Sequence, residues 1–155
     1  MRELYQQVIL DHSKNPRHFE KRVEAQVTQT CYNPLCGDSI EVFCDFKKDN
    51  QGIDKLTFSG SGCAISVASA SMMMGILQDQ DKIFFDAAFK YLKDLIEFGS
   101  ATEVPEILQG SKKVITSMQA ISGVREYPMR VKCATCAWHS MAGACRGGEG
   151  PIKTE

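Results

Sequence analysis

Side chains that can bind a metal ion or carry sulfur occur in three separate segments of the chain. The first segment, residues 33–38, reads Asn-Pro-Leu-Cys-Gly-Asp and places Cys36 two positions before Asp38. Proline and glycine favour a turn there, so the thiol and the carboxylate can point the same way. Both groups are ligands of tetrahedral metal ions such as zinc. The segment therefore supplies half of a candidate metal site, with a buried cysteine beside a turn-capping aspartate as the simpler alternative.

The second and third segments each place a cysteine at the predicted start of a helix. Cys63 follows the sequence Gly-Ser-Gly, and Cys133 follows Arg130 and Lys132. The free N–H groups and the dipole of a helix N-terminus favour a thiolate, and nearby cations do the same. We therefore expect both cysteines to favour the thiolate form. The alternatives are structural cysteines packed at helix starts and a solvated basic surface.

Cys136 forms a Cys-x-x-Cys pair with Cys133, and the sequence leaves its role open. A thioredoxin-like redox pair would require a βαβ unit, and a zinc ribbon would require a second such pair; the sequence has neither. On a helix the two cysteines share one face, so Cys136 is either an extra ligand or a resolving thiol. We expect Cys31 and Cys44 to be core residues and Cys145 to be exposed.

The elements that must position these residues follow from the hydrophobic pattern. A helical stripe covers residues 1–12, and alternation with a period of two runs from about residue 25 to 60. From there the pattern predicts helices over 64–77, 83–98 and 105–121, and a last one from about 133. We expect an α+β fold in which an N-terminal helix and a three-stranded antiparallel sheet precede helices that pack on the sheet. One domain covers residues 1–142, and the glycine-rich residues 143–155 form a flexible tail.

Composition excludes several classes of protein. The 155 residues carry 18 Lys and Arg against 19 Asp and Glu, which lacks the cationic excess of a nucleic-acid-binding surface. No apolar run is long enough for a membrane span, and no signal-sequence pattern opens the chain. Seven cysteines, an odd number, cannot all pair in disulfides. Metal binding or thiol chemistry in the cytoplasm is therefore the expected use of cysteine.

Four segments, in order along the chain, resemble the U-type iron–sulfur cluster assembly scaffold family, which comprises IscU, the N-terminal part of NifU, and SufU. They are residues 11–17, 33–38, 59–66 and 130–134. The long spacing between Cys63 and Cys133 is most similar to SufU. Lys132 stands where IscU has histidine, and residues 127–130 replace the segment by which IscU engages its chaperone. The resemblance implies a SufE/NifU-like fold.

The resemblance also implies a set of site residues. Cys36, Asp38, Cys63 and Cys133 would be the metal ligands, and the three cysteines would hold a transient [2Fe–2S] cluster or, as in SufU, zinc. Cys36 and Cys133 are the candidate acceptors of a persulfide. Arg130 would orient the partner or the incoming sulfur.

From the same resemblance we expect a scaffold or carrier rather than a true enzyme. It would take sulfur from a cysteine desulfurase that uses pyridoxal phosphate, of the SufS or IscS type, and pass a cluster to apo iron–sulfur proteins. The main alternative is a zinc-dependent sulfurtransferase of a SUF-type system that relays persulfide without building a cluster. A protein with a purely structural zinc site is a third possibility. We expect a monomer or a weak dimer.

Overall fold

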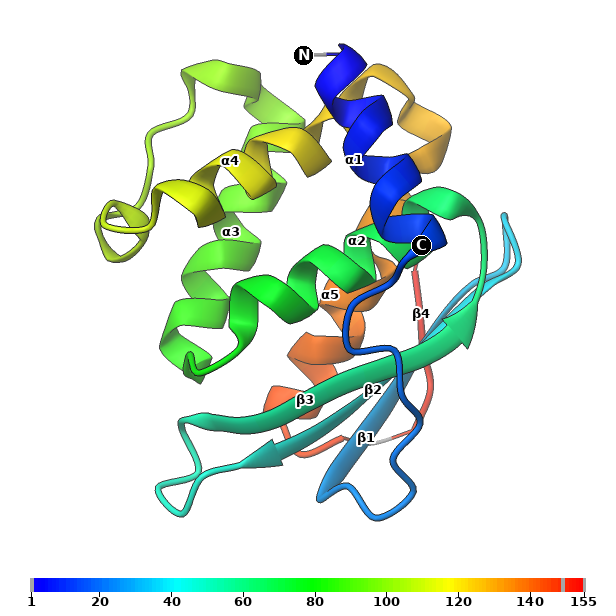
Figure 1. Cartoon of the computed structure of the whole chain (residues 1–155), viewed down its shortest axis with the longest axis vertical. Helices are drawn as coiled ribbons and strands as arrows, with labels where there is room; N and C mark the ends of the chain where they lie inside the picture. The colour runs from blue at the N-terminus through cyan, green and yellow to red at the C-terminus, as the bar shows by residue number, and fades with distance from the viewer. Residues whose placement is uncertain (1, 149, 155) are drawn as a thin grey trace.

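The computed structural model describes residues 2–148 and 150–154, and its helices gather on one side of a four-stranded sheet (Figure 1). The helices are α1 (Arg2–Lys14), α2 (Ala64–Leu77), α3 (Lys82–Phe98), α4 (Lys112–Ile121) and α5 (Val131–Cys145). The strands are β1 (Val27–Asn33), β2 (Asp38–Phe46), β3 (Ile53–Ser61) and β4 (Ile152–Lys153). The α+β fold with an N-terminal helix, predicted from the hydrophobic pattern, is confirmed.

The sheet differs from the predicted one in its fourth strand. Its order is β3-β2-β1-β4, and β1 to β3 form the expected antiparallel meander. However, β4 pairs with β1 in parallel, with Cys31 opposite Ile152 and Tyr32 opposite Lys153. The sheet is therefore mixed, and the prediction of a purely antiparallel, three-stranded sheet is wrong. Two residues are too few to produce the alternation by which the other strands were found.

Residues 143–155, predicted as a flexible tail, contain two segments of regular structure. Helix α5 continues to Cys145, and Ile152–Lys153 form β4. Glu149 and Glu155 of this segment, like Met1 of the predicted domain 1–142, lie outside the described residues.

Helix α2 has the composition of a helix that is buried among other elements. Its first half consists almost entirely of alanine and serine, and most of its side chains are buried. The Ser69 hydroxyl donates to the Ala134 carbonyl oxygen at 2.6 Å and accepts from Trp138 Nε1 at 3.1 Å, which ties α2 to α5. Small side chains allow this close approach, and Met72, Met73 and Met74 fill the core as expected.

The remaining helices follow the sequence with one interruption. Asp81 caps α3 by accepting a hydrogen bond from the Phe84 amide at 2.8 Å, and Gly99, with φ of 81°, follows its last residue. The helix predicted over 105–121 is divided, because a short 3-10 turn (Glu106–Leu108) is separated from α4 by Gly110. Among the described residues, no helix has both the length and the apolarity for a membrane span.

Candidate metal centre

Three elements bring candidate ligands together at one end of the sheet. The turn between β1 and β2 carries Cys36, and β2 begins with Asp38, which pairs with Asn33 at the end of β1. Cys133 lies in the first turn of α5. The thiol sulfur atoms of Cys36 and Cys133 and a carboxylate oxygen of Asp38 all lie within 4.8 Å of one another. Three side chains that are distant in the sequence, of the four predicted as ligands, therefore meet.

Asp38 is held by hydrogen bonds to both of its carboxylate oxygens. The backbone N–H of Cys63 donates to Oδ1 at 2.9 Å, and the side-chain amide of Asn33 donates to Oδ2 at 2.9 Å. Burial opposes ionisation of Asp38, but these hydrogen bonds, with those from the Cys133 thiol and the Ser66 hydroxyl, lower its pKa below the usual value. Asp38 is thus an ionised, oriented ligand although it is almost fully buried.

Cys133 departs from the expected electrostatics. It is completely buried, and its burial, together with hydrogen bonds to Asp38 and Cys36, raises the pKa of its thiol. The prediction that Arg130 and the helix start favour a thiolate at Cys133 is therefore wrong for the metal-free protein. The thiol keeps its proton and donates a hydrogen bond to the adjacent Asp38 carboxylate, so a metal ion that binds Cys133 must displace that proton.

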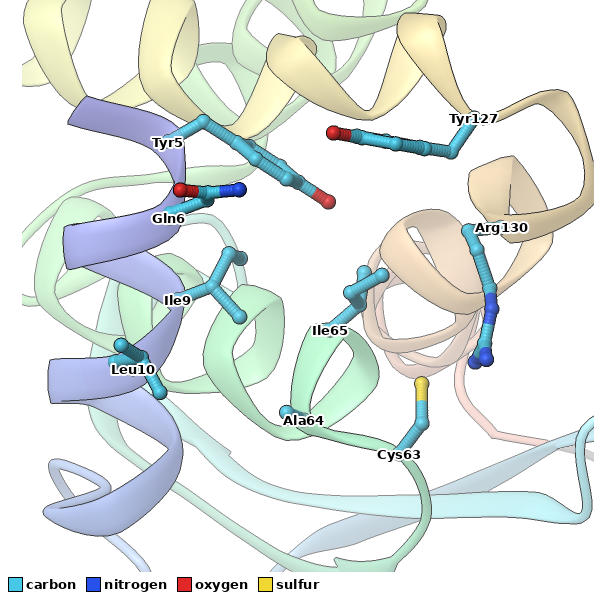
Figure 2. Close-up of a pocket in the computed structure, with 9 residues that line it drawn as sticks. All are labelled: Tyr5, Gln6, Ile9, Leu10, Cys63, Ala64, Ile65, Tyr127 and Arg130. Atoms are coloured by element: carbon cyan, nitrogen blue, oxygen red, sulfur yellow. The ribbon is translucent and has the colours of Figure 1, made fainter. Parts of the chain in front are cut away.

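Cys63 occupies the N-cap position of α2, as predicted, but its thiol lies outside the group of three ligand atoms. The thiol is half-buried and interacts with the Cys133 thiol and with the charge of Arg130. In Figure 2 the guanidinium of Arg130 reaches toward the Cys63 sulfur. Three of the four predicted ligands therefore meet, and the fourth lies beside them.

Arg130 stands at the entrance of the site. Its side chain is exposed, and Nη1 lies 3.9 Å from the sulfur of Cys36. Interactions with Cys133, Cys63 and Cys36 raise the pKa of Arg130, so its charge is fixed in place beside three sulfur atoms. A permanent cation at this point favours any anionic sulfur that arrives at the site.

Two supporting residues escaped the sequence analysis. The Asn33 amide contacts Asp38 and also donates to the Cys133 sulfur at 3.4 Å, so it joins two of the ligands. Its position before Pro34 indicates only a turn, which gave no signal of this role. The Gly-Ser-Gly sequence before Cys63 gave no indication that Gly62 packs against the site. A Cβ at Gly62 would lie 2.5 Å from Asp38 Oδ1 and collide with the Ser66 hydroxyl.

A largely apolar cavity of about 520 Å³ opens beside Cys63 (Figure 2). Helix α1 forms one wall, the first residues of α2 form the floor, and Tyr127 and Arg130 form the opposite wall. The rings of Tyr5 and Tyr127 stack with their centroids 5.9 Å apart. Burial is the main cause that raises the pKa of Tyr5 to about 12, and charge repulsion from Tyr127, Cys63 and Cys133 adds to it. The phenol of Tyr5 therefore stays neutral.

The other cysteines are divided between the core and the end of α5, and none of the seven forms a disulfide. Cys31, Cys44 and Cys136 are completely buried, which confirms the first two as core residues. The Cys136 thiol donates to the carbonyl oxygen of Cys31 at 3.2 Å. Cys145, expected to be exposed, is half-buried, and this burial raises the pKa of its thiol to about 11.

The donor set fits a metal ion. Two thiol sulfurs and one carboxylate oxygen, with Cys63 close by, match the sulfur-rich tetrahedral coordination of zinc and also bind iron. The carboxylate is already ionised and oriented by Asn33, as ligands in metal sites commonly are. Cys36, Asp38 and Cys133 would hold such an ion, with Cys63 as the nearest further ligand.

Comparison with known proteins gives a consistent result. Residues 4–134 match the sequence model of the NifU-like N-terminal domain. The chain is 33% identical to the zinc-dependent sulfurtransferase SufU of Bacillus subtilis, over 89% of this chain and 86% of that protein. It is 32% identical to the iron–sulfur cluster assembly scaffold protein IscU of Streptococcus pyogenes, over 94% of this chain and 85% of that protein.

A solved structure supports the same relationship. The crystal structure of a candidate iron–sulfur cluster assembly scaffold protein for the SUF system from Fervidobacterium islandicum superposes with a TM-score of 0.74 at 26% identity. The superposition covers 90% of this chain and 95% of that one. The mixed α+β architecture described above is therefore found in an experimentally determined relative.

We predict that Gly62→Ala lowers the free energy of unfolding by about 1–3 kcal/mol, because the new methyl group must displace Asp38 or Ser66. Zinc affinity should fall with it. Gly75→Ala on the exposed side of α2 is the matched control, since its Cβ meets nothing within 4 Å. That change should be neutral or stabilise by about 0.5–1 kcal/mol. Urea unfolding of both variants measures the difference; equal stabilities would contradict the described packing at Gly62.

Asp38→Asn should make the stability of the metal-free protein less dependent on pH. The pKa of Asp38 is lower in the folded chain than in the unfolded chain, so its ionisation stabilises the fold above about pH 4. This contribution disappears as the pH falls through the folded pKa. The difference in unfolding free energy between wild type and variant should therefore be largest near neutrality and shrink below about pH 4. A difference that stays constant from neutral to acidic pH would show that the charge contributes nothing.

Proposed function

Because the chain belongs to the NifU-like N-terminal domain family, we propose that it is a scaffold on which iron–sulfur clusters are assembled. It accepts sulfur from a cysteine desulfurase, binds iron as a substrate, and passes a nascent [2Fe–2S] cluster to apo-proteins. The observation that carries this proposal is the meeting of two thiols and one carboxylate within 4.8 Å of one another, with a third thiol beside them.

The composition of the site suits temporary binding. Sulfur ligands hold iron and zinc strongly, whereas a single carboxylate is a harder ligand that exchanges more readily. Asp38 is also stabilised as a free carboxylate by Asn33 and the Cys63 amide, so it does not depend on the metal for a partner. When bound, the metal would neutralise the clustered thiolates. We infer that Asp38 keeps the site able to release its cargo.

Sulfur would enter at Cys36. Its thiol is half-buried, unlike that of Cys133, and lies 3.9 Å from the guanidinium of Arg130, which would stabilise an arriving persulfide anion. The thiol of Cys133 lies within 4.8 Å and can attack the outer sulfur of a Cys36 persulfide. That exchange leaves Cys36 as a thiol and the persulfide on Cys133. The donor would be a desulfurase that uses pyridoxal phosphate.

One relative supports a second function. The chain is 33% identical to a protein named zinc-dependent sulfurtransferase, and its donor set suits zinc. In that case zinc would be resident, Cys36 would relay persulfide, and no cluster would form. Under either function, seven unpaired cysteines suit a reducing compartment, so we place the protein in the cytoplasm.

Anaerobic reconstitution distinguishes these functions. The purified protein is incubated with a cysteine desulfurase, cysteine and ferrous iron, and its absorption, metal content and acid-labile sulfide are measured. We expect a coloured cluster that moves to an apo-ferredoxin. Zinc that is retained while the protein stimulates desulfurase turnover would favour the sulfurtransferase. Retained zinc with neither activity, together with unfolding on chelation, would leave only a structural role.

Asp38→Ala should hold the reconstituted cluster longer and transfer it more slowly to apo-ferredoxin, by about tenfold or more, because the exchangeable oxygen ligand is lost. Asp54→Ala, which removes an exposed carboxylate from β3, is the matched control and should transfer like wild type. Transfer kinetics followed by circular dichroism measure both variants. Unchanged transfer in Asp38→Ala would contradict the proposed role of Asp38.

A further inference from the structure

Two buried cysteines lie in contact in the core and belong to neither proposed function. Cys31 is on β1 and Cys136 is on α5, and both are completely buried. The Cys136 sulfur donates to the Cys31 carbonyl oxygen at 3.2 Å, and the Cys31 sulfur donates to the carbonyl oxygen of Tyr32 at 3.9 Å. Neither sulfur is part of the group formed by Cys36, Asp38 and Cys133.

This thiol pair lies next to Cys133. Cys136 follows Cys133 by three residues within α5, so the two side chains occupy the same face of the helix with Cβ atoms about 5–6 Å apart. Their Cα separation in a helix falls within the range of about 4.4–6.8 Å found for disulfides. Cys133 lies in the first turn of α5, where a helix adjusts most easily. The Cβ atoms of disulfides lie about 3.5–4.5 Å apart, so a sulfur–sulfur bond between the two residues requires the first turn of α5 to adjust.

We infer that Cys136 is a resolving thiol that releases sulfide from a persulfide on Cys133, with Cys31 as the thiol that then frees Cys133. The inference rests on the proposed function, which supplies the persulfide. It concerns the reduction step, because a persulfide carries sulfane sulfur whereas a cluster contains sulfide.

The first step balances without an external reductant. The Cys136 sulfur attacks the inner sulfur of the Cys133 persulfide anion and forms a Cys133–Cys136 disulfide, while the bond between the two persulfide sulfurs breaks. The outer sulfur departs with that electron pair and takes the Cys136 proton, so it leaves as hydrosulfide. Cys136 is oxidised and the outer sulfur is reduced.

The second step restores the ligand. The Cys31 thiol attacks the Cys136 sulfur of the new disulfide, giving a Cys31–Cys136 disulfide and a free Cys133 thiol. The proton of Cys31 passes to Cys133. Because Cys31 and Cys136 are already in contact, the disulfide ends in the core and Cys133 is again available for binding.

The alternative is that Cys136 is a small apolar residue that fills space between α5 and β1. Cys136→Ser separates the two roles, because serine has nearly the same size and still donates to the Cys31 carbonyl oxygen. The hydroxyl does not attack a persulfide under these conditions. A packing role would survive this substitution, whereas a resolving role would be lost.

The test is a single turnover without oxygen or added reductant. A cysteine desulfurase that carries persulfide on its active-site cysteine is freed of cysteine by desalting and mixed with the chain. Released sulfide is measured as methylene blue, and peptide mass spectrometry locates added sulfur and disulfides. Wild type should release close to one sulfide per sulfur transferred and gain a disulfide that contains Cys136. Cys136→Ser should keep the extra sulfur on Cys133 and release sulfide at least about tenfold more slowly.

Controls separate the possible outcomes. Cys145→Ser, at the other end of α5, should release sulfide like wild type. Cys31→Ser should leave the disulfide between Cys133 and Cys136, and the same location in wild type would overturn the second step. Release from Cys136→Ser at the wild-type rate would overturn the resolving role while the observed sulfur transfer leaves the proposed function standing. If wild type takes up no sulfur at all, the proposed function fails and this inference fails with it.

Discussion

The site depends on the way Asp38 is held. One carboxylate oxygen accepts from the backbone N–H of Cys63, and the other accepts from the Asn33 amide, so a single side chain joins the ends of β1 and β2 to the start of α2. Because a buried carboxylate without such partners would be protonated or costly, these contacts are needed for an ionised ligand in this position. The missing side chain of Gly62 leaves the space that they require. The positions of Cys36 and Cys63 follow from this arrangement, since Cys63 supplies one of the hydrogen bonds itself and Cys36 lies two residues before Asp38.

Cys133 is positioned by a different part of the structure. It lies on α5, which is held in place by contacts along its length. The Ala134 carbonyl oxygen accepts a hydrogen bond from the Ser69 hydroxyl of α2, and the Ser140 hydroxyl donates to the Ile40 carbonyl oxygen of β2 at 2.9 Å. Small side chains on the facing helix make this approach possible. The candidate metal centre therefore lies between the end of the sheet and a separately packed helix. Binding of an ion across it would join the two parts of the fold, as expected where ligands come from distant segments.

Local features of the fold were predictable because they depend on patterns among neighbouring residues. The bounds of α2 and the N-cap position of Cys63 follow from a glycine-rich break before a helical pattern. By contrast, β4 is two residues long, and its pairing with β1 depends on the path of the chain after α5. The family resemblance implied four ligands, Cys36, Asp38, Cys63 and Cys133. However, the high thiol pKa of Cys133 depends on its burial and on a carboxylate 95 positions away in the sequence, and only the folded chain brings the two groups together. The role of Asn33 was not predictable for the same reason. An asparagine in a turn gives the same sequence pattern whether or not its side chain orients a metal ligand.

Both outer strands of the meander, β1 and β3, are paired along part of their length. Along β1, β4 occupies the outer side, and the Thr154 amide donates to the Tyr32 carbonyl oxygen at 2.9 Å. Along β3, the chain after α1 runs beside Phe58, with Phe58 donating to His18 and accepting from Glu20 through backbone groups. Open edge strands invite strand addition by other chains and lead to aggregation. With these backbone groups occupied, fewer positions along β1 and β3 are open to a partner that would extend the sheet.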